Sequence, residues 1–179
     1  MIYEFLAEGF ELVEAMTPVD MLRRAGADVK TVSITYDKAV KASNGVTVIA
    51  DITLSDIGDI LPDMIILPGG MPGSSNLRAC KRVCDLALTC FKKEIPIGAI
   101  CAAPYILGEL GILKGKRAIC YPGFEDKLVG AEISDKNCVR DGMIITAAGM
   151  GAALSFSSEL VSLLYGREKA EEILKSIIA

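Results

Sequence analysis

Apolar segments alternate with amphipathic segments along most of the chain, the pattern of an α/β protein with a mainly parallel sheet. Buried strands are expected at 2–6, 29–34, 64–67, 97–100 and 143–147. Glu4 is the one misfit in the first strand. Helices are expected at 11–25, 76–92, 102–110, 152–165 and 167–178. Two short strands at 39–42 and 46–50 flank Ser43-Asn44-Gly45, a turn signal that predicts a hairpin.

The remaining region, 115–141, is expected to hold only short strands and turns. The chain has 179 residues, of which 51% are hydrophobic, and this length suits one sizeable core rather than two. No repeat, low-complexity tract or linker interrupts it. We therefore expect a single domain that covers 1–179.

The charge distribution argues against nucleic-acid and membrane partners. The formal net charge is −4, and no basic cluster is longer than Arg23-Arg24 or Lys92-Lys93, whereas a nucleic-acid surface needs a concentrated basic patch. The N-terminus carries Glu4 and Glu8 and has no basic or apolar region of a signal peptide. The longest uncharged run, 142–158, is too short to span a membrane. The sequence predicts a soluble, cytoplasmic protein.

The chain contains no histidine, which removes Cys-His and Ser-His dyads from consideration. A homo-oligomer cannot supply the missing imidazole either. Cys80 and Cys84 form a close pair without a second pair at matching spacing, so we expect no metal. The six cysteines are expected to stay reduced and to behave as small hydrophobic residues unless their surroundings activate them.

Cys101 lies where a predicted strand turns into a predicted helix, with Ala99 and Ala103 two positions away on either side. This is the layout of a nucleophile elbow, in which a tight turn tolerates only small neighbours. At a helix N-terminus, backbone N–H groups and the helix dipole lower the pKa of a thiol. The alternative is that Cys101 is a core cysteine packed below the sheet.

Two other segments are expected at the same edge of the sheet, because the C-terminal ends of parallel strands meet there. Gly69-Gly70 follows one strand, and its N–H groups together with that of Ala102 can form an oxyanion hole, although a double glycine is often only a turn. Glu8 and Glu11 suit a helix N-terminus. Glu14 lies deeper in the helix, where burial would raise its pKa and let it carry a proton in place of histidine.

These segments resemble the DJ-1/ThiJ/PfpI superfamily, and most closely its DJ-1-like branch of bacterial type. The resemblance rests on Leu6-Ala7-Glu8-Gly9-Phe10-Glu11-Leu12-Val13-Glu14, Thr17-Pro18-Val19-Asp20, Leu67-Pro68-Gly69-Gly70 and Ala99-Ile100-Cys101-Ala102-Ala103-Pro104. It implies a flavodoxin-like three-layer α/β sandwich and a homodimer. It also implies that Cys101 is the reactive cysteine, that Glu14 is the protonated glutamate bonded to it, and that Gly70 and Ala102 supply the oxyanion amides.

The sequence departs from the family pattern at two places near Cys101. The protease-like branch has histidine directly after the cysteine, where this chain has Ala102, so protease activity is not expected. Several relatives have histidine before a proline where this chain has Tyr121, which can donate a hydrogen bond but is a poor base near neutral pH. Cys120 is a weak candidate for a resolving thiol, because strand neighbours point in opposite directions.

Three functions remain open. The first is a cofactor-independent glyoxalase or deglycase, in which Cys101 adds to a small 2-oxoaldehyde such as methylglyoxal and Glu14 moves the proton that gives a 2-hydroxy acid. The second is an oxidative-stress sensor or redox-regulated chaperone that uses oxidation of Cys101. The third is a role in thiamine (thiazole monophosphate) biosynthesis, which the family label suggests and no phosphate-binding sequence here supports independently.

Overall fold

The computed structural model describes residues 1–179 and has a seven-stranded sheet at its centre. The strand order is β10-β11-β7-β6-β1-β2-β5, and every neighbouring pair is parallel except β10 with β11. The strands are β1 (Ile2–Leu6), β2 (Val29–Ser33), β5 (Ile52–Thr53), β6 (Met64–Leu67), β7 (Ile97–Ile100), β10 (Cys138–Asp141) and β11 (Ile144–Ala147). The predicted mainly parallel sheet is confirmed.

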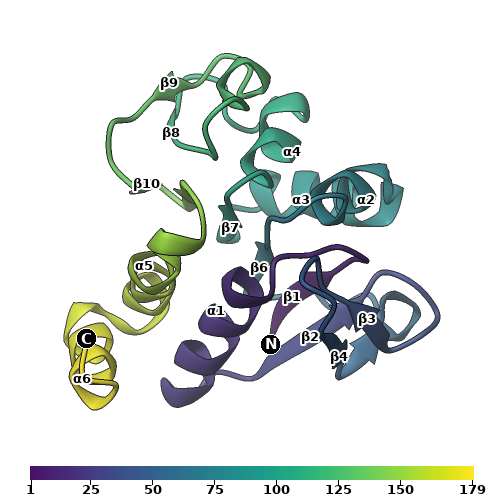
Figure 1. Ribbon diagram of the computed structural model, residues 1–179. Coiled ribbons are helices and arrows are strands. Elements are labelled where there is room, and N and C mark those ends of the chain that lie inside the picture. The colour runs from purple at the N-terminus through teal and green to yellow at the C-terminus, as the bar shows by residue number, and fades with distance from the viewer.

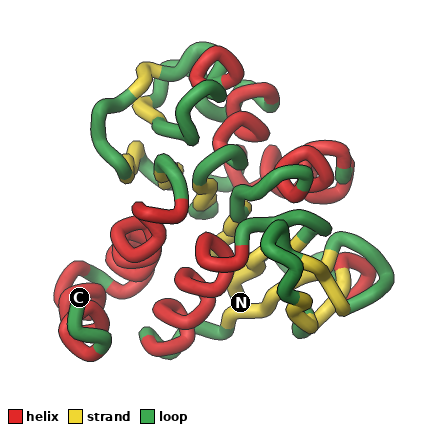
Figure 2. The backbone as a smooth tube through the Cα atoms, in the orientation of Figure 1, coloured by secondary structure: helices red, strands yellow, loops and turns green.

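Helices cover both faces of this sheet, as Figures 1 and 2 show. One face carries α1 (Leu12–Arg24), α5 (Ala153–Tyr165) and α6 (Arg167–Ser176). The other carries α2 (Gly73–Ala79), α3 (Lys81–Lys92) and α4 (Pro104–Glu109). The result is the three-layer sandwich that the resemblance implies. No helix is both long enough and apolar enough to cross a membrane.

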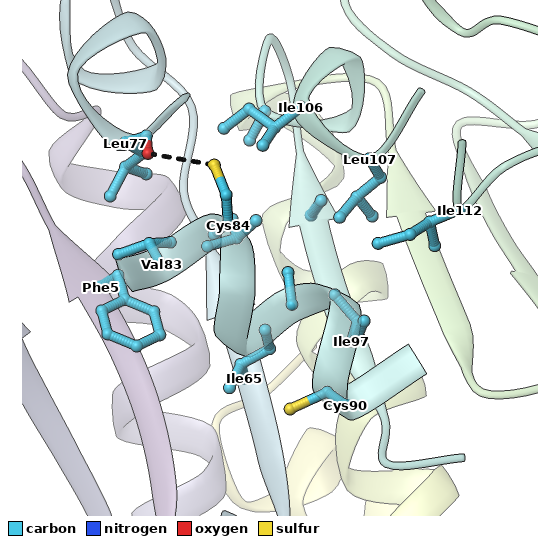
Figure 3. Close-up of a cluster of buried hydrophobic side chains, with 14 of the residues drawn as sticks. Phe5, Ile65, Leu77, Val83, Cys84, Cys90, Ile97, Ile106, Leu107 and Ile112 are labelled. Atoms are coloured by element: carbon cyan, nitrogen blue, oxygen red, sulfur yellow. Dashed lines mark hydrogen bonds between the residues drawn. The ribbon is translucent and has the colours of Figure 1, made fainter. Parts of the chain in front are cut away.

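Alternation along the strands divides the core into two layers. In β6, Ile65 and Leu67 face the side of α3, whereas Met64 and Ile66 face the side of α1 and α5, and all four are fully buried. Figure 3 shows the first layer, where Val83 and Cys84 of α3 lie against the sheet. Because both faces are covered, the central strands β6 and β7 are continuously apolar rather than alternating with polar residues.

The strand order brings the candidate residues together. β1 lies between β2 and β6, so the order of strands reverses its direction at β1. In open parallel sheets, ligands bind at the C-terminal ends of the strands beside such a reversal. Gly69 follows β6, Cys101 follows β7 and Gly149 follows β11 at this edge. The helix after β1 brings Glu14 there as well.

The predicted hairpin is confirmed as β3 (Ala39–Lys41) and β4 (Thr47–Ile49), which pair antiparallel. The region 115–141 holds β8 (Arg117–Ala118), β9 (Glu132–Ile133) and β10 with connecting turns. The prediction of one long helix over 76–92 is wrong, because Cys80 takes an extended conformation between α2 and α3. Leu77 and Val83, six residues apart, would point about 120° apart on one straight helix, and the break lets both reach the same core cluster.

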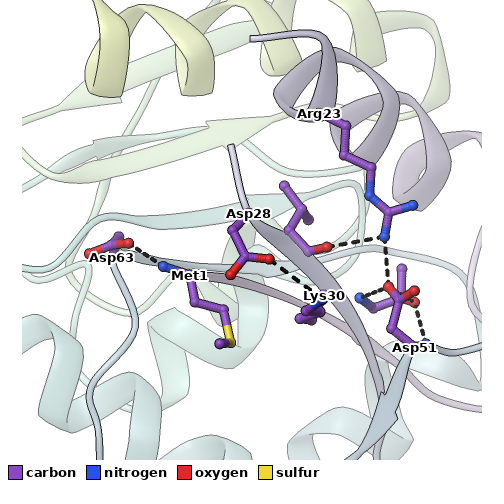
Figure 4. A network of polar contacts seen from close by, with 8 residues as sticks. Met1, Arg23, Asp28, Lys30, Asp51 and Asp63 are labelled. Atoms are coloured by element: carbon purple, nitrogen blue, oxygen red, sulfur yellow. Dashed lines mark hydrogen bonds and ion pairs between the residues drawn. The ribbon is translucent and has the colours of Figure 1, made fainter. Parts of the chain in front are cut away.

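A polar network borders the N-terminal side of the sheet (Figure 4). The Met1 amino group pairs with Asp63, and the Arg23 guanidinium contacts Asp51 at 2.7 Å. Asp51 also accepts hydrogen bonds from the N–H and the hydroxyl of Thr31, each at 2.8 Å. These contacts fix β2 to the segment before β5 and leave Thr31 without a free hydroxyl proton.

Gly108 allows α4 to lie close to the backbone of the segment that follows Tyr121, at Lys127. A Cβ atom at this position would lie 2.2 Å from the carbonyl oxygen of Lys127. Alanine is the better helix former by about 1 kcal/mol, so helix propensity alone predicts that Gly108→Ala is stabilising. We expect the reverse. Gly108→Ala should lower the free energy of unfolding by about 2 kcal/mol or more, because the backbone at Lys127 must move to make room for the added carbon. Urea unfolding measures this free energy.

Gly58→Ala is the matched control, since a Cβ atom there meets nothing within 4 Å and the backbone does not need glycine. It is expected to change the free energy of unfolding by less than about 1 kcal/mol. A Gly108→Ala protein as stable as the Gly58→Ala protein would contradict the close approach of α4 to Lys127.

Candidate active site

Cys101 occupies the turn between β7 and α4 with a φ of +63°, in the left-handed region that side-chain-bearing residues rarely adopt. Such a conformation costs about 1–3 kcal/mol and persists only where the surroundings enforce it. The Cys101 N–H donates to the carbonyl of Ala147 at 2.8 Å, and Ala99, Ala102 and Ala103 around it are buried. The predicted nucleophile elbow is confirmed.

Glu14 reaches the sulfur from α1 and is almost completely buried, with 1% of its surface exposed. Its Oε2 accepts a hydrogen bond from the backbone N–H of Gly69 at 3.0 Å. The backbone N–H of Met150 and the Cys101 side chain lie near enough to the carboxyl to act to lower its pKa. Burial raises the pKa of Glu14 to about 7, and the neighbouring charge of Glu11 adds to the rise. A proton can therefore reside on Glu14 near neutral pH.

The electrostatics of the sulfur differ from what the helix N-terminus alone suggests. Burial and the charge of Glu14 raise the pKa of Cys101 to about 12, although the backbone N–H groups of Gly70 and Ala102 act to lower it. The short α4 does not outweigh these two effects. The charge of Glu14 disappears when its carboxyl takes up a proton, so a thiolate at neutral pH requires protonated Glu14. The two groups titrate as one coupled pair.

The double glycine has two separate roles. A Cβ atom at Gly69 would lie 2.4 Å from Oε2 of Glu14 and 2.5 Å from Cβ of Cys101, so only glycine fits between them. The N–H of Gly69 is taken by Glu14, which corrects our prediction that it serves substrate. Gly70 has a φ of +87°, and its N–H faces the sulfur together with that of Ala102. These are the two donors that the sequence predicts for an oxyanion, and that role stays a prediction.

Tyr121 lies at the mouth of the site and is 52% exposed. Its N–H donates to the carbonyl of Cys101 at 2.7 Å. A cavity of about 370 Å³ lies beside the pair, and its lining includes Tyr121, Pro122, Asn137, Gly149 and Met150 but neither Cys101 nor Glu14. Gly149 is the link between the two, because a Cβ atom built on it would lie 3.9 Å from Sγ of Cys101.

Other candidates lie away from the pair. Cys120 is buried in the core cluster on the α3 side, whereas Cys101 packs against the cluster on the side of α1 and α5. Glu8 is exposed, and Glu11 accepts a hydrogen bond from the hydroxyl of Ser43. No group of three or more metal-ligating side chains is present. Sequence reasoning missed the backbone N–H of Met150, whose one signal was the glycine turn at 149–151 after a strand.

Comparisons with known proteins identify the family to which the chain is similar. The model of the DJ-1/PfpI family matches residues 1–163. Protein DJ-1 homolog B of Arabidopsis thaliana is 41% identical over 174 residues, which are 94% of this chain and 39% of that protein. Glutathione-independent glyoxalase DJR-1.2 of Caenorhabditis elegans is 34% identical over 172 residues, which are 95% of this chain and 91% of that protein.

A solved structure, the oxidized form of Toxoplasma gondii DJ-1, superimposes with a TM-score of 0.95 at 32% identity, covering 99% of this chain and 97% of that one. The chain therefore belongs to the DJ-1/PfpI family, as the sequence predicts. It spans 39% and 44% of the length of the two Arabidopsis relatives that it matches.

The raised pKa of Glu14 predicts a pH-dependent stability. The folded chain binds this proton more tightly than the unfolded chain, whose carboxyl has an ordinary pKa near 4.5. Stability from this group is therefore complete below pH 4.5 and falls as the pH rises to about 7, by about 3 kcal/mol in all. Glu14→Gln is expected to remove that slope.

The measurement is urea unfolding of both proteins at several values between pH 4.5 and 8, and the quantity compared is the difference in unfolding free energy between them. A constant difference across this range would show that Glu14 titrates as an ordinary exposed carboxyl.

Proposed function

We propose that this chain is a cofactor-independent glyoxalase that converts small 2-oxoaldehydes such as methylglyoxal to 2-hydroxy acids. The observation that carries the proposal is the proton-sharing pair: a strained, half-buried Cys101 next to a buried Glu14 whose pKa is about 7. The naming of one relative as a glutathione-independent glyoxalase supports it. Deglycation of glyoxal-modified amines would use the same adduct.

The reaction begins when the proton of the pair is on Glu14 and the sulfur is a thiolate. The sulfur forms a bond to the aldehyde carbon, and the carbonyl oxygen becomes an oxyanion that the N–H groups of Gly70 and Ala102 stabilise. Glu14 then gives its proton to this oxygen, which yields a hemithioacetal. The carbon–sulfur bond holds the substrate within reach of the Glu14 carboxylate.

The ionised Glu14 next removes the proton on the former aldehyde carbon and returns a proton to the adjacent ketone carbon, with a pKa near 7 that suits both steps. The hydroxyl proton on the carbon that bears sulfur passes to the oxygen of the former ketone. The former ketone thereby becomes a hydroxyl and the carbon on sulfur becomes a thioester. Water hydrolyses the thioester, releasing the 2-hydroxy acid and the thiol. The net change is addition of one water, with no external oxidant or reductant. Tyr121, at the mouth, is proposed to donate a hydrogen bond to the substrate.

The first test compares wild type and Cys101→Ala with methylglyoxal as substrate. Wild type should form lactate and the variant should form none above the uncatalysed rate, because the covalent adduct cannot arise. Chiral chromatography of D- and L-lactate measures the product. Cys138→Ala, at another half-buried cysteine, is the matched control and should keep wild-type activity. Equal lactate from wild type and Cys101→Ala would exclude the proposal.

A second test separates the two roles of Glu14. Glu14→Gln keeps a hydrogen-bond donor beside the sulfur and removes the negative charge, so alkylation of Cys101 at pH 7 should be at least as fast as in wild type. Lactate formation should fall by about 100-fold or more, because an amide cannot carry the proton. Peptide mass spectrometry after iodoacetamide treatment measures the rate of Cys101 alkylation. Unchanged turnover would show that another group moves the proton.

An alternative function is redox sensing or redox-regulated chaperoning through Cys101, which is supported by the pocket itself. Protonated Glu14 and the N–H groups of Gly70 and Ala102 are donors suited to the oxygens of a sulfinate. Graded peroxide should oxidise Cys101 before the half-buried Cys80 and Cys138. Even oxidation of all six cysteines, followed by peptide mass spectrometry, would count against it.

The proposal also includes a homodimer. Exposed apolar side chains of α1 and of the start of α5, Val13 and Leu154, border a groove of about 560 Å³ that a second copy would cover. Light scattering of the purified chain measures the mass in solution.

A further inference from the structure

Glu4 is the polar residue that interrupts an otherwise apolar strand, and its side chain is fully buried. It lies in β1 on the same face as Ile2, beneath the layer formed by α1 and α5. Neither of its carboxyl oxygens has a hydrogen-bond partner within the protein. Buried polar groups are nearly always bonded, so a side chain in this state calls for an explanation.

The neighbours of Glu4 cannot satisfy it. The register places Thr31 of β2 and Ile66 of β6 beside it. Ile66 is apolar, and the Thr31 hydroxyl already donates to Oδ2 of Asp51 at 2.8 Å and accepts from the N–H of Asp51 at 2.9 Å. The residues that α1 buries around Glu14 are apolar: Ala15, Pro18, Val19, Met21 and Leu22.

Two acidic groups near Glu4 matter here, Asp51 and Glu14, and their ionisation differs. Although burial acts to raise the pKa of Asp51, hydrogen bonds from Thr31 and the charge of Arg23 hold it below its ordinary value, so Asp51 is ionised and already paired. Glu14 is the group that interacts electrostatically with Glu4. Burial, and then the charge of Glu14, raise the pKa of Glu4 well above its ordinary range. Glu4 therefore keeps its proton when Glu14 has lost one.

We propose that Glu4 is a positioning residue for the Cys101–Glu14 pair, a neutral carboxylic acid whose unpartnered O–H dipole turns toward ionised Glu14 and stabilises it across the layer between β1 and α1. Glu4 neither gains nor loses a proton in this role, and no bond to it forms or breaks. Two buried carboxyls that interact electrostatically do not readily ionise together, so one of them remains available as a neutral donor. The same use of a neutral acid occurs in enzymes that stabilise a buried anion.

The inference deepens the proposed function, because ionised Glu14 is the form that removes the substrate proton. It also explains why an unpaired acid lies where an apolar side chain would pack without loss of hydrogen bonds. The role differs from that of Glu11, whose negative charge disfavours ionised Glu14.

The test measures the ionisation of Glu14 directly, in protein labelled with 13C at glutamate carboxyls and titrated by NMR. The resonance of Glu14 is identified by its loss in Glu14→Gln. In Glu4→Leu, which has similar volume and no donor, the midpoint of Glu14 should rise by about one pH unit. In Glu4→Gln, whose amide can still donate, it should stay near the wild-type value. Glu11→Gln is the control of opposite sign and should lower it.

A second readout follows turnover. Once the hemithioacetal has formed, Glu14 must be ionised to remove the substrate proton. If its midpoint rises from about 7 to about 8, the ionised fraction at pH 7 falls about five-fold, and the rate of lactate formation by Glu4→Leu at saturating methylglyoxal should fall with it. Glu4→Gln should restore the rate. The Glu4→Leu protein is expected to be at least as stable as wild type. A midpoint and a rate in Glu4→Leu equal to those of wild type would overturn the inference.

The two proposals fail separately. If wild type forms no lactate but Glu4→Leu still raises the midpoint of Glu14, the glyoxalase proposal is wrong and the role of Glu4 stands. If wild type forms lactate and the midpoint of Glu14 is the same in all Glu4 variants, the glyoxalase proposal stands and the role of Glu4 is wrong. Should Glu4→Leu not fold, the resonance of Glu4 itself decides: its midpoint must lie above that of Glu14 and must fall in Glu14→Gln.

Discussion

The contact between the Gly69 N–H and the Glu14 carboxylate is the interaction on which the site depends. It joins α1 to the end of β6, directly beneath the sulfur of Cys101. The 3.0 Å bond fixes one carboxyl oxygen, and the absence of a side chain at residue 69 lets that oxygen and the Cys101 turn approach each other. Without this contact, a buried acid and a strained cysteine would be two separate destabilising features rather than one coupled pair.

Most of the fold follows from the sequence because burial and chain geometry act locally. The strand limits at 2–6, 64–67 and 97–100 agree with the structure, since both faces of these strands are covered and their sequences are apolar throughout apart from Glu4. The break at Cys80 has no glycine or proline to signal it. It arises because α2 and α3 pack independently on the sheet, and such packing cannot be read from either helix alone.

Some features of the candidate site could likewise be predicted from the sequence, and others could not. Cys101, Glu14 and Gly70 could be predicted because each follows a recognisable strand end or helix position. The use of the Gly69 N–H and the contribution of Met150 could not, because backbone donors carry no residue-type signal. The pKa of Cys101 was expected to fall with the helix N-terminus, and it rises because burial and the facing carboxylate are tertiary effects. Glu4 was visible as a misfit, but its relation to Glu14 depends on which face of β1 lies under α1.

The site has a rigid floor and a variable rim. At the floor, Gly69 and Gly70 leave no room for a single added carbon atom, and the atoms that would collide belong to the reacting pair and to the backbone. At the rim, Tyr121 and Met150 are about half exposed and lie on connections between elements, where substitution disturbs little packing. Changes at the rim can therefore alter which molecules reach the sulfur while the geometry of the Cys101–Glu14 pair below stays the same. The surface that an incoming molecule meets first is thus free to vary independently of the pair beneath it.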